Sequence, residues 1–310
     1  MTSPSAFATA LPSEIAFPEN GTLLFDEIVE SFRAGKIYIG PQKGGGTFYW
    51  DLNMTAHGLI GGRTGAGKSV CLDVIAFLAL WCSDVAEIVV CDPKQTTFSW
   101  ASEFTADGHV AVSTNEIADA IDDVWRELDR RQSLLVKRGV RTVESLRRLY
   151  AAHPEFEAED GPAPKRLILL FDEISHFWAK SGDEDTEKRK ATTRSQMEDI
   201  GRLARSLEIN MVITAQRPDS NTISVSLRDM LGFRLCVGPV TESLSKQILR
   251  TTHGTRFPEF GTPKGRAWAT TDEGDVRNVQ LPFLPDSTGP CSWDPTSTIT
   301  GTVDRLRTKR

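Results

Sequence analysis

Eight consecutive residues form a pattern that binds nucleotide phosphates. They follow the scheme G-x-x-x-x-G-K-S and are Gly62, Arg63, Thr64, Gly65, Ala66, Gly67, Lys68 and Ser69. In such a loop, successive backbone N–H groups and the N-terminus of the next helix surround the phosphates. The lysine reaches the β- and γ-phosphates, and the serine hydroxyl binds Mg²⁺. The spacing therefore predicts that Lys68 and Ser69 bind the phosphates and the metal of a nucleoside triphosphate.

Two adjacent carboxylates supply the rest of a hydrolytic site. Asp172 and Glu173 directly follow the continuous apolar run 167–171. An aspartate at the end of a buried strand can hold Mg²⁺ through the water molecules bound to the metal. We therefore expect Asp172 to act as a Walker B residue. Glu173 is the candidate general base. The alternative is a structural acidic pair at a helix N-terminus, but the phosphate loop upstream favours hydrolysis of ATP.

A neutral amide follows a further apolar run. Residues 211–214 are typical of a strand, and the segment Thr214-Ala-Gln216-Arg217-Pro218 begins at its end. Ligands of parallel sheets lie at the carboxyl ends of strands, so Gln216 is a candidate sensor of the γ-phosphate. The alternative is that Gln216 is only a polar turn residue before Pro218.

The order of apolar runs predicts the elements that position these residues. We expect strands at residues 59–61, 87–91, 167–171, 211–214, 233–237, 266–270 and 276–281. We expect helices at residues 68–82, from a capping box of Ser113 and Glu116 onward, at 196–207 and near 242–249. Residues 155–164 are predicted to form an acidic loop, and 181–194 an exposed excursion. The alternation of strands and helices indicates an α/β fold with a mostly parallel sheet flanked by helices.

The chain divides into four parts by composition. Residues 1–20 are rich in Ser, Pro and Ala and are expected to be a flexible leader, and residues 286–310 a flexible tail with a basic end. Residues 21–55 are expected to form a short helix at 23–32 and a β-hairpin from strands at 36–40 and 47–50, a β-rich lead-in. Residues 56–285 are then the nucleotide-binding domain.

Composition excludes several other classes of protein. With 310 residues, 39% hydrophobic and 25% charged, the chain has ordinary globular composition. It has no apolar stretch long enough to span a bilayer and no signal peptide at its start, so we expect a cytoplasmic protein without an integral membrane segment. Five cysteines without a C-x-x-C pair argue against a disulfide framework or a zinc site.

Charge alone does not reveal a partner. The formal net charge of -6 gives no overall basic signature for nucleic acid. Residues 126–148 nevertheless carry eight Lys or Arg against three Asp or Glu. This segment is either a solvated helix face or a contact surface for phosphates or a neighbouring subunit.

The motifs together resemble those of a known family. The phosphate loop, Asp92-Pro93-Lys94, residues 127–131, the two carboxylates, residues 202–205 and the A-Q-R-P segment occur in the order seen in FtsK/SpoIIIE-type DNA translocases, of the HerA-FtsK superfamily. The resemblance implies a RecA-like P-loop ATPase that assembles as a ring, usually a hexamer, and pumps double-stranded DNA. It also implies an arginine that completes the site of a neighbouring subunit. Arg205 is one candidate, and Arg130 or Arg131 is the other.

The chain also departs from the full-length translocases, which add N-terminal membrane helices and a C-terminal winged-helix domain. Neither is expected here, which favours a short soluble motor of the kind found on mobile elements, plasmids or phages. An alternative is a secretion or conjugation coupling ATPase that acts on a protein or relaxase, with a membrane or relaxase partner supplied by another protein. A third is a binding module with weak ATPase activity, which the complete set Lys68, Ser69, Asp172 and Glu173 disfavours.

Overall fold

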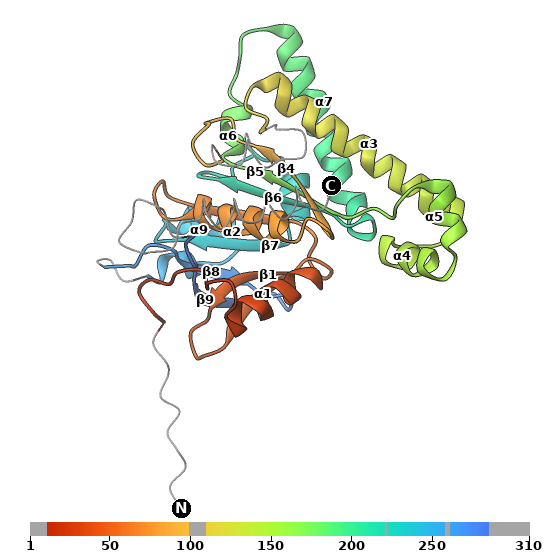
Figure 1. Ribbon diagram of the computed structural model, residues 1–310. Helices are drawn as coiled ribbons and strands as arrows, with labels where there is room; N and C mark the ends of the chain where they lie inside the picture. The colour runs from red at the N-terminus through yellow and green to blue at the C-terminus, as the bar shows by residue number, and fades with distance from the viewer. Residues whose placement is uncertain (1–10, 99–109, 221, 258–260, 285–310) are drawn as a thin grey trace, which may run out of the picture.

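A seven-stranded sheet forms the centre of the molecule (Figure 1). This structure is a computed structural model and describes residues 11–98, 110–220, 222–257 and 261–284. In spatial order the strands are β4 (Ala86–Cys91), β5 (Arg166–Phe171), β6 (Ile209–Ala215), β3 (Gly58–Gly62), β7 (Phe233–Val237), β8 (Arg266–Thr270) and β9 (Val276–Gln280). Strands β4 to β7 in this order pair in parallel, and β8 and β9 are added antiparallel. The expected mostly parallel α/β sheet is confirmed.

Helices cover both faces of the sheet because its strands are apolar on both sides. Ile60 of β3 packs into one core cluster and its neighbour Leu59 into the other. The first cluster contains α1 (Leu23–Arg33), the antiparallel hairpin of β1 (Lys36–Pro41) and β2 (Thr47–Asp51), and α2 (Lys68–Trp81). The second contains α3 (Thr114–Arg138), α4 (Val143–Ala152), α6 (Ile174–Phe177), α7 (Glu184–Leu203), η2 (Ala204–Leu207) and α8 (Val225–Met230). The parallel strands are therefore enclosed on both faces.

Smaller elements complete the fold around this sandwich. Helix α9 (Glu242–Leu249) packs on β7 through Ile248 and Cys236, and η3 (His253–Thr255) follows it. Helices α3 and α7 lie along one another at the top of Figure 1, whereas α1 and β1 lie at the bottom. The capping box predicted for α3 is present, since the Ser113 side chain accepts from the Glu116 backbone and the Glu116 side chain accepts from the Ser113 backbone.

Two segments predicted to lack regular structure are helical. The acidic segment contains α5 (Pro154–Asp160), which begins with proline at a position that needs no N–H donor. The segment predicted as an exposed excursion forms the first half of α7, whose N-cap Asp183 accepts from Thr186 N at 2.8 Å. Lys190 and Thr193 are buried on this helix, so its apolar stripe is interrupted by polar residues and the periodicity is hidden.

The prediction of a flexible leader over residues 1–20 is wrong for its second half. Ala16 pairs with Phe283 beside the sheet, and Phe17 is 1% exposed, with its ring against those of Phe25, Tyr38 and Phe77. A single aromatic side chain in a Ser/Pro/Ala-rich segment anchors it because burying a phenyl ring is strongly favourable. Residues 1–10 and the predicted tail 286–310 lie outside the described residues. Within the described part of the chain, no helix has the length and apolarity to cross a membrane.

Candidate active site

The phosphate loop connects β3 to α2 in the way its sequence requires. Strand β3 ends at Gly62 and helix α2 begins at Lys68. Gly62 has φ 149° and Gly67 has φ 111°, which are conformations that side chains with a Cβ rarely adopt. A Cβ at Gly62 would also lie 2.3 Å from the carbonyl oxygen of Val237. Both glycines are therefore needed for the path of the loop.

Lys68 is folded back onto the loop that precedes it. Its side chain is buried, and Nζ donates to the carbonyl oxygens of Gly62 at 2.9 Å and Arg63 at 3.1 Å. Burial lowers the pKa of Lys68, while the carboxylates of Glu173 and Asp172 act in the opposite direction. The ammonium is thus held by neutral carbonyl oxygens that phosphate oxygens can replace.

Asp172 lies beside Ser69 at the end of β5. Its Oδ1 accepts from Thr214 Oγ1 at 2.5 Å, and its Oδ2 accepts from Thr97 Oγ1 at 2.5 Å. The hydroxyl of Ser69 lies 3.4 Å from the same Oδ2. Hydroxyl and carboxylate oxygens are the hard ligands that Mg²⁺ prefers, so this pair fits the predicted metal site.

Glu173 has every carboxylate oxygen engaged. Its backbone is left-handed, with φ 47°, and its N–H donates to Thr214 Oγ1 at 2.7 Å. Oε1 accepts from Ser175 Oγ at 2.6 Å and from the backbone N–H of Gln216 at 3.1 Å, and Oε2 lies 3.4 Å from Lys94 Nζ. Burial raises the pKa of Glu173, but these donors and the nearby lysines outweigh it, so the pKa lies below its usual value. The buried carboxylate is therefore ionised, as a general base must be.

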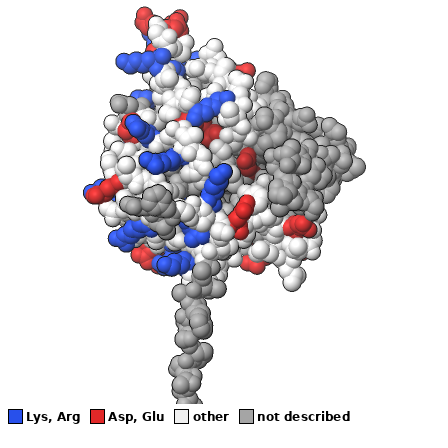
Figure 2. Space-filling view, turned by 90° about the vertical axis from the view of Figure 1, so that its left-hand side faces the viewer, with Lys and Arg blue, Asp and Glu red and all other residues white. Residues whose placement is uncertain are grey.

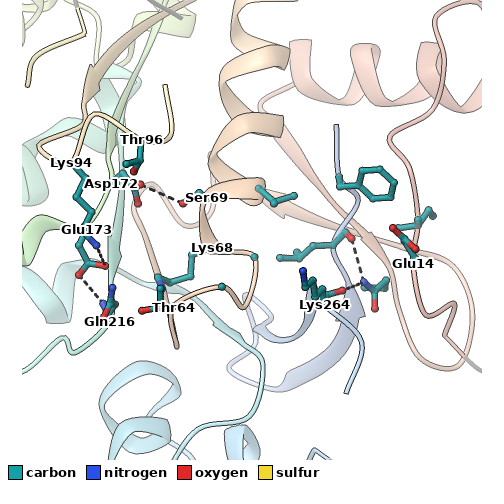
Figure 3. A pocket seen from close by; sticks show the side chains of 18 of the residues that line it. Glu14, Thr64, Lys68, Ser69, Lys94, Thr96, Asp172, Glu173, Gln216 and Lys264 are labelled. Atoms are coloured by element: carbon teal, nitrogen blue, oxygen red, sulfur yellow. Dashed lines mark hydrogen bonds and ion pairs between the residues drawn. The ribbon is translucent and has the colours of Figure 1, made fainter. Parts of the chain in front are cut away.

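These residues line one end of a cavity of about 660 Å³ (Figure 3). The predicted residues that meet there are Thr64, Gly65, Gly67, Lys68, Ser69, Asp172, Glu173 and Gln216. Arg63 instead lines a neighbouring cavity of about 610 Å³, and Gln216 borders both. The structure thus brings the phosphate loop, both carboxylates and the amide of the A-Q-R-P segment to one place.

Sequence reasoning missed the other end of this cavity. It is lined by Ser13, Glu14 and Ile15 from the segment that was predicted to be a flexible leader, and by Lys264, Gly265, Gln280, Leu281 and Phe283 (Figure 3). Apolar side chains such as Ile15 and Phe283 beside a phosphate site suit the base of a nucleotide. Lys94, Thr97 and Ser175 were also missed as partners of the carboxylates. The signal in the sequence for residues 13–17 was the pair of apolar side chains Ile15 and Phe17.

The two arginine candidates occupy different environments. Arg205 is exposed on η2, just before β6, so it lies at the edge of the sheet opposite the phosphate loop, and its Nε donates to Asn53 O at 3.0 Å. Arg131 is 1% exposed, with Nε bound to Glu127 at 2.7 Å and Nη1 donating to Leu207 O at 2.8 Å. These internal partners contradict the prediction that Arg131 reaches a neighbouring subunit, because its guanidinium is not accessible.

The curated relatives of this chain include DNA translocases. One is "DNA translocase FtsK" of Halalkalibacterium halodurans, 24% identical over 257 residues, which covers 78% of this chain and 31% of the relative. Another is "DNA translocase SftA" of Bacillus subtilis, 26% identical over 214 residues, covering 68% of this chain and 21% of the relative. The chain therefore spans less than a third of the length of these relatives.

Solved structures of other proteins share this fold. The structure of the pCW3 conjugation coupling protein TcpA with ATPγS has a TM-score of 0.75 and 24% identity, covering 96% of this chain and 75% of TcpA. The cytoplasmic domain of the type VII secretion ATPase EccC of Thermomonospora curvata has a TM-score of 0.66 and 17% identity, covering 87% of this chain and 31% of the other. These likenesses show a RecA-like ATPase fold.

A family model decides the classification. The model of the FtsK/SpoIIIE family matches residues 30–232, a segment that contains the phosphate loop, both carboxylates and Gln216. The match covers more than half of the chain and extends from α1 to the start of β7. The chain therefore belongs to the FtsK/SpoIIIE family of P-loop ATPases.

Proposed function

We propose that this protein is an ATP-driven motor that assembles as a hexameric ring and translocates double-stranded DNA. The observation that carries the chemistry is the meeting of Lys68, Asp172 and Glu173 in one cavity with Ser69 and Gln216. The names of the curated relatives support DNA as the substrate. A moving motor contacts phosphates rather than base edges, because its grip cannot depend on sequence.

The residues have separate tasks in the proposed hydrolysis. Lys68 exchanges its carbonyl partners for oxygens of the β- and γ-phosphates, and Gln216 contacts the γ-phosphate with its amide. Glu173 orients the attacking water and accepts its proton. Ser69 and Asp172 would hold Mg²⁺, which neutralises charge on the phosphates when it is bound. The oxygen of the water forms a bond to the γ-phosphorus while the bond from this phosphorus to the β-γ bridging oxygen breaks. The products are ADP and phosphate.

The surface is compatible with discrete phosphate contacts. Figure 2 shows the face that lies on the left in Figure 1, where Lys and Arg side chains are spread over the surface with Asp and Glu between and around them. No single basic track dominates the described part of this face. A ring that repeats several separate cations around a channel would still present many phosphate contacts to one duplex.

The test of this function is ATPase activity with duplex DNA of increasing length at low salt. We expect stimulation by DNA, and particle images of the Glu173→Gln protein with ATP should show rings. Lys68→Ala should abolish turnover, whereas Glu173→Gln should retain nucleotide without hydrolysing it. The exposed Lys188, which pairs only with acidic residues of its own helix, provides the control Lys188→Ala, which should behave as the unchanged protein.

A second candidate is a coupling ATPase that acts on a protein or relaxase. The likeness to the conjugation coupling protein TcpA over 96% of this chain favours it. The same assay separates the two functions, because a coupling ATPase for a protein substrate would show no stimulation at any DNA length. That result, with hydrolysis still dependent on Lys68, would replace the DNA translocase by the coupling ATPase.

A further inference from the structure

The loop that follows β4 contacts both carboxylates of the active site. Thr97 Oγ1 donates to Asp172. Lys94 Nζ lies 3.4 Å from Glu173 Oε2 (Figure 3). Asp92 shapes this loop, since its Oδ2 accepts from the backbone N–H groups of Thr97 at 2.9 Å and Phe98 at 3.1 Å. Residues 92–98 of this connection therefore place two side chains against the two carboxylates of the proposed hydrolytic site.

The Lys94 ammonium lies against one oxygen of the proposed base, Glu173. Oε1 of Glu173 already accepts two hydrogen bonds, from Ser175 and from the Gln216 backbone, so Oε2 is the oxygen with remaining capacity to accept from a water molecule. Oε2 is the atom that faces the Lys94 ammonium. Glu173 is only 4% exposed at its side chain, so bulk water does not compete strongly for this contact. The ammonium competes with a water molecule for Oε2, so its departure would favour activation of water at this atom.

The same ammonium lies within reach of a nucleotide. Lys94 lines the cavity together with Lys68, and its side chain is 26% exposed on a flexible stem of four carbons. A terminal phosphate carries more negative charge than one carboxylate and offers several acceptor oxygens. ADP lacks the γ-phosphate and so provides no equivalent partner for the ammonium. A triphosphate, but not a diphosphate, can therefore compete with Glu173 for the Lys94 ammonium.

We propose that Lys94 is a positioning residue that restrains Glu173 in the nucleotide-free protein and transfers its ammonium to the terminal phosphate when ATP binds. The transfer frees Glu173 Oε2 to accept the proton of the attacking water. Hydrolytic competence is thereby tied to the presence of the γ-phosphate. This inference rests on the proposed role of Glu173 as the base, but it assigns to Lys94 a task that can be measured without turnover.

The first test is discrimination between triphosphate and diphosphate. We expect Lys94→Met to weaken binding of ATPγS about tenfold or more, as for loss of a charged hydrogen bond, and to change ADP binding by less than about twofold. Unchanged ADP binding also shows that the variant is folded. Lys94→Arg should retain part of the discrimination, and the exposed Lys188→Met should retain all of it. Equal weakening of both nucleotides, or unchanged discrimination, would overturn the proposal.

The second test measures the contact between Lys94 and Glu173 directly. In the presence of Lys94, Glu173→Gln removes the partner that holds the ammonium, so ATPγS affinity should rise. The same substitution in a Lys94→Met background can remove only the repulsion between carboxylate and phosphate, and its gain should be smaller by about threefold or more. Equal gains in ATPγS affinity in the two backgrounds would overturn the proposed transfer of the Lys94 ammonium. Normal hydrolysis by Glu173→Gln would instead reject the proposed base, a separate result.

Discussion

At the residue scale, the feature that matters most is a buried carboxylate kept ionised by its neighbours. Burial alone would raise the pKa of Glu173 and favour the protonated form, which cannot accept a proton. The hydroxyl of Ser175, at 2.6 Å, is the strongest of the contacts that lower the pKa, followed by the Gln216 N–H. Ser175 lies two residues after Glu173, at the start of α6, so the same turn that buries this carboxylate also supplies its donor.

Loss of this donor should change the pH dependence of hydrolysis. Ser175→Ala removes the contact and raises the pKa of Glu173, so the base becomes protonated at a higher pH. The acidic limb of the kcat/KM profile, which reports the free enzyme, should therefore move to higher pH. Ser175→Thr keeps a hydroxyl and should leave the limb near its original place. A limb that stays fixed in Ser175→Ala would mean that another group than Glu173 governs the profile.

Spacing in the sequence predicted part of this site and not the rest. The phosphate loop is a local motif, since one turn of the chain places Lys68 and Ser69. The apolar strand β5 places Asp172 at its carboxyl end. The contacts of Lys94 and Thr97 with the carboxylates depend on how the loop after β4 crosses the end of β5. That path is set by tertiary packing and by the Asp92 turn, so no spacing rule predicts it.

At the scale of elements, Arg131 anchors the long helix α3 to the end of the sheet. Its guanidinium bridges Glu127 on its own helix and the carbonyl oxygens of Leu207 and Glu208, which end η2 and precede β6. Burial lowers the pKa of Arg131, while the contact with Glu127 raises it. The adjacent Arg130 also pairs with Glu127, but its side chain is 47% exposed. The two neighbours in sequence therefore have different structural tasks.

This difference predicts different effects on stability. Arg131→Ala should lower the free energy of unfolding by about 2–4 kcal/mol, because it leaves the carbonyl oxygens of Leu207 and Glu208 without their donor, removes one of the two cations at Glu127 and leaves a cavity. Arg130→Ala should cost about 0–1 kcal/mol, as for an exposed ion pair. Denaturant unfolding of the two variants, compared with the unchanged chain, measures both. Similar small effects for both variants would show that Arg131 is not an anchor and would reopen its assignment to an interface.

Element prediction succeeded where one signal dominated. The strand predicted at residues 167–171 is apolar throughout, and the cap of α3 uses the predicted pair Ser113 and Glu116. It failed where the decisive contact is distant in sequence. The first half of α7 is too polar to show a stripe, and Phe17 is fixed by aromatic rings of α1, β1 and α2 and by its backbone hydrogen bond to Phe283. Such tertiary burial overrides the local composition on which the leader was predicted.

At the scale of the whole molecule, the sheet separates two groups that the proposed ring would bring together. The phosphate loop lies at the carboxyl ends of the parallel strands, and Arg205 lies before the amino end of β6. Arg205 therefore cannot complete the site of its own chain. In a ring with head-to-tail contacts, one edge of a subunit faces the opposite edge of the next, so an exposed arginine at that place can reach a neighbouring nucleotide.

Mixing two inactive variants tests this arrangement. Arg205→Ala subunits keep an intact phosphate loop, and Lys68→Ala subunits keep an intact arginine. If Arg205 acts across the interface, both variants alone should be inactive, while random mixing in equal amounts should restore about a quarter of the sites. Arg202→Ala is the matched control, because Arg202 is 59% exposed nearby and pairs with Asp199 within its own helix. It should remain active alone. If no ratio of the two inactive variants restores hydrolysis, Arg205 does not act in trans, and the arginine that completes the site must come from another surface of the ring.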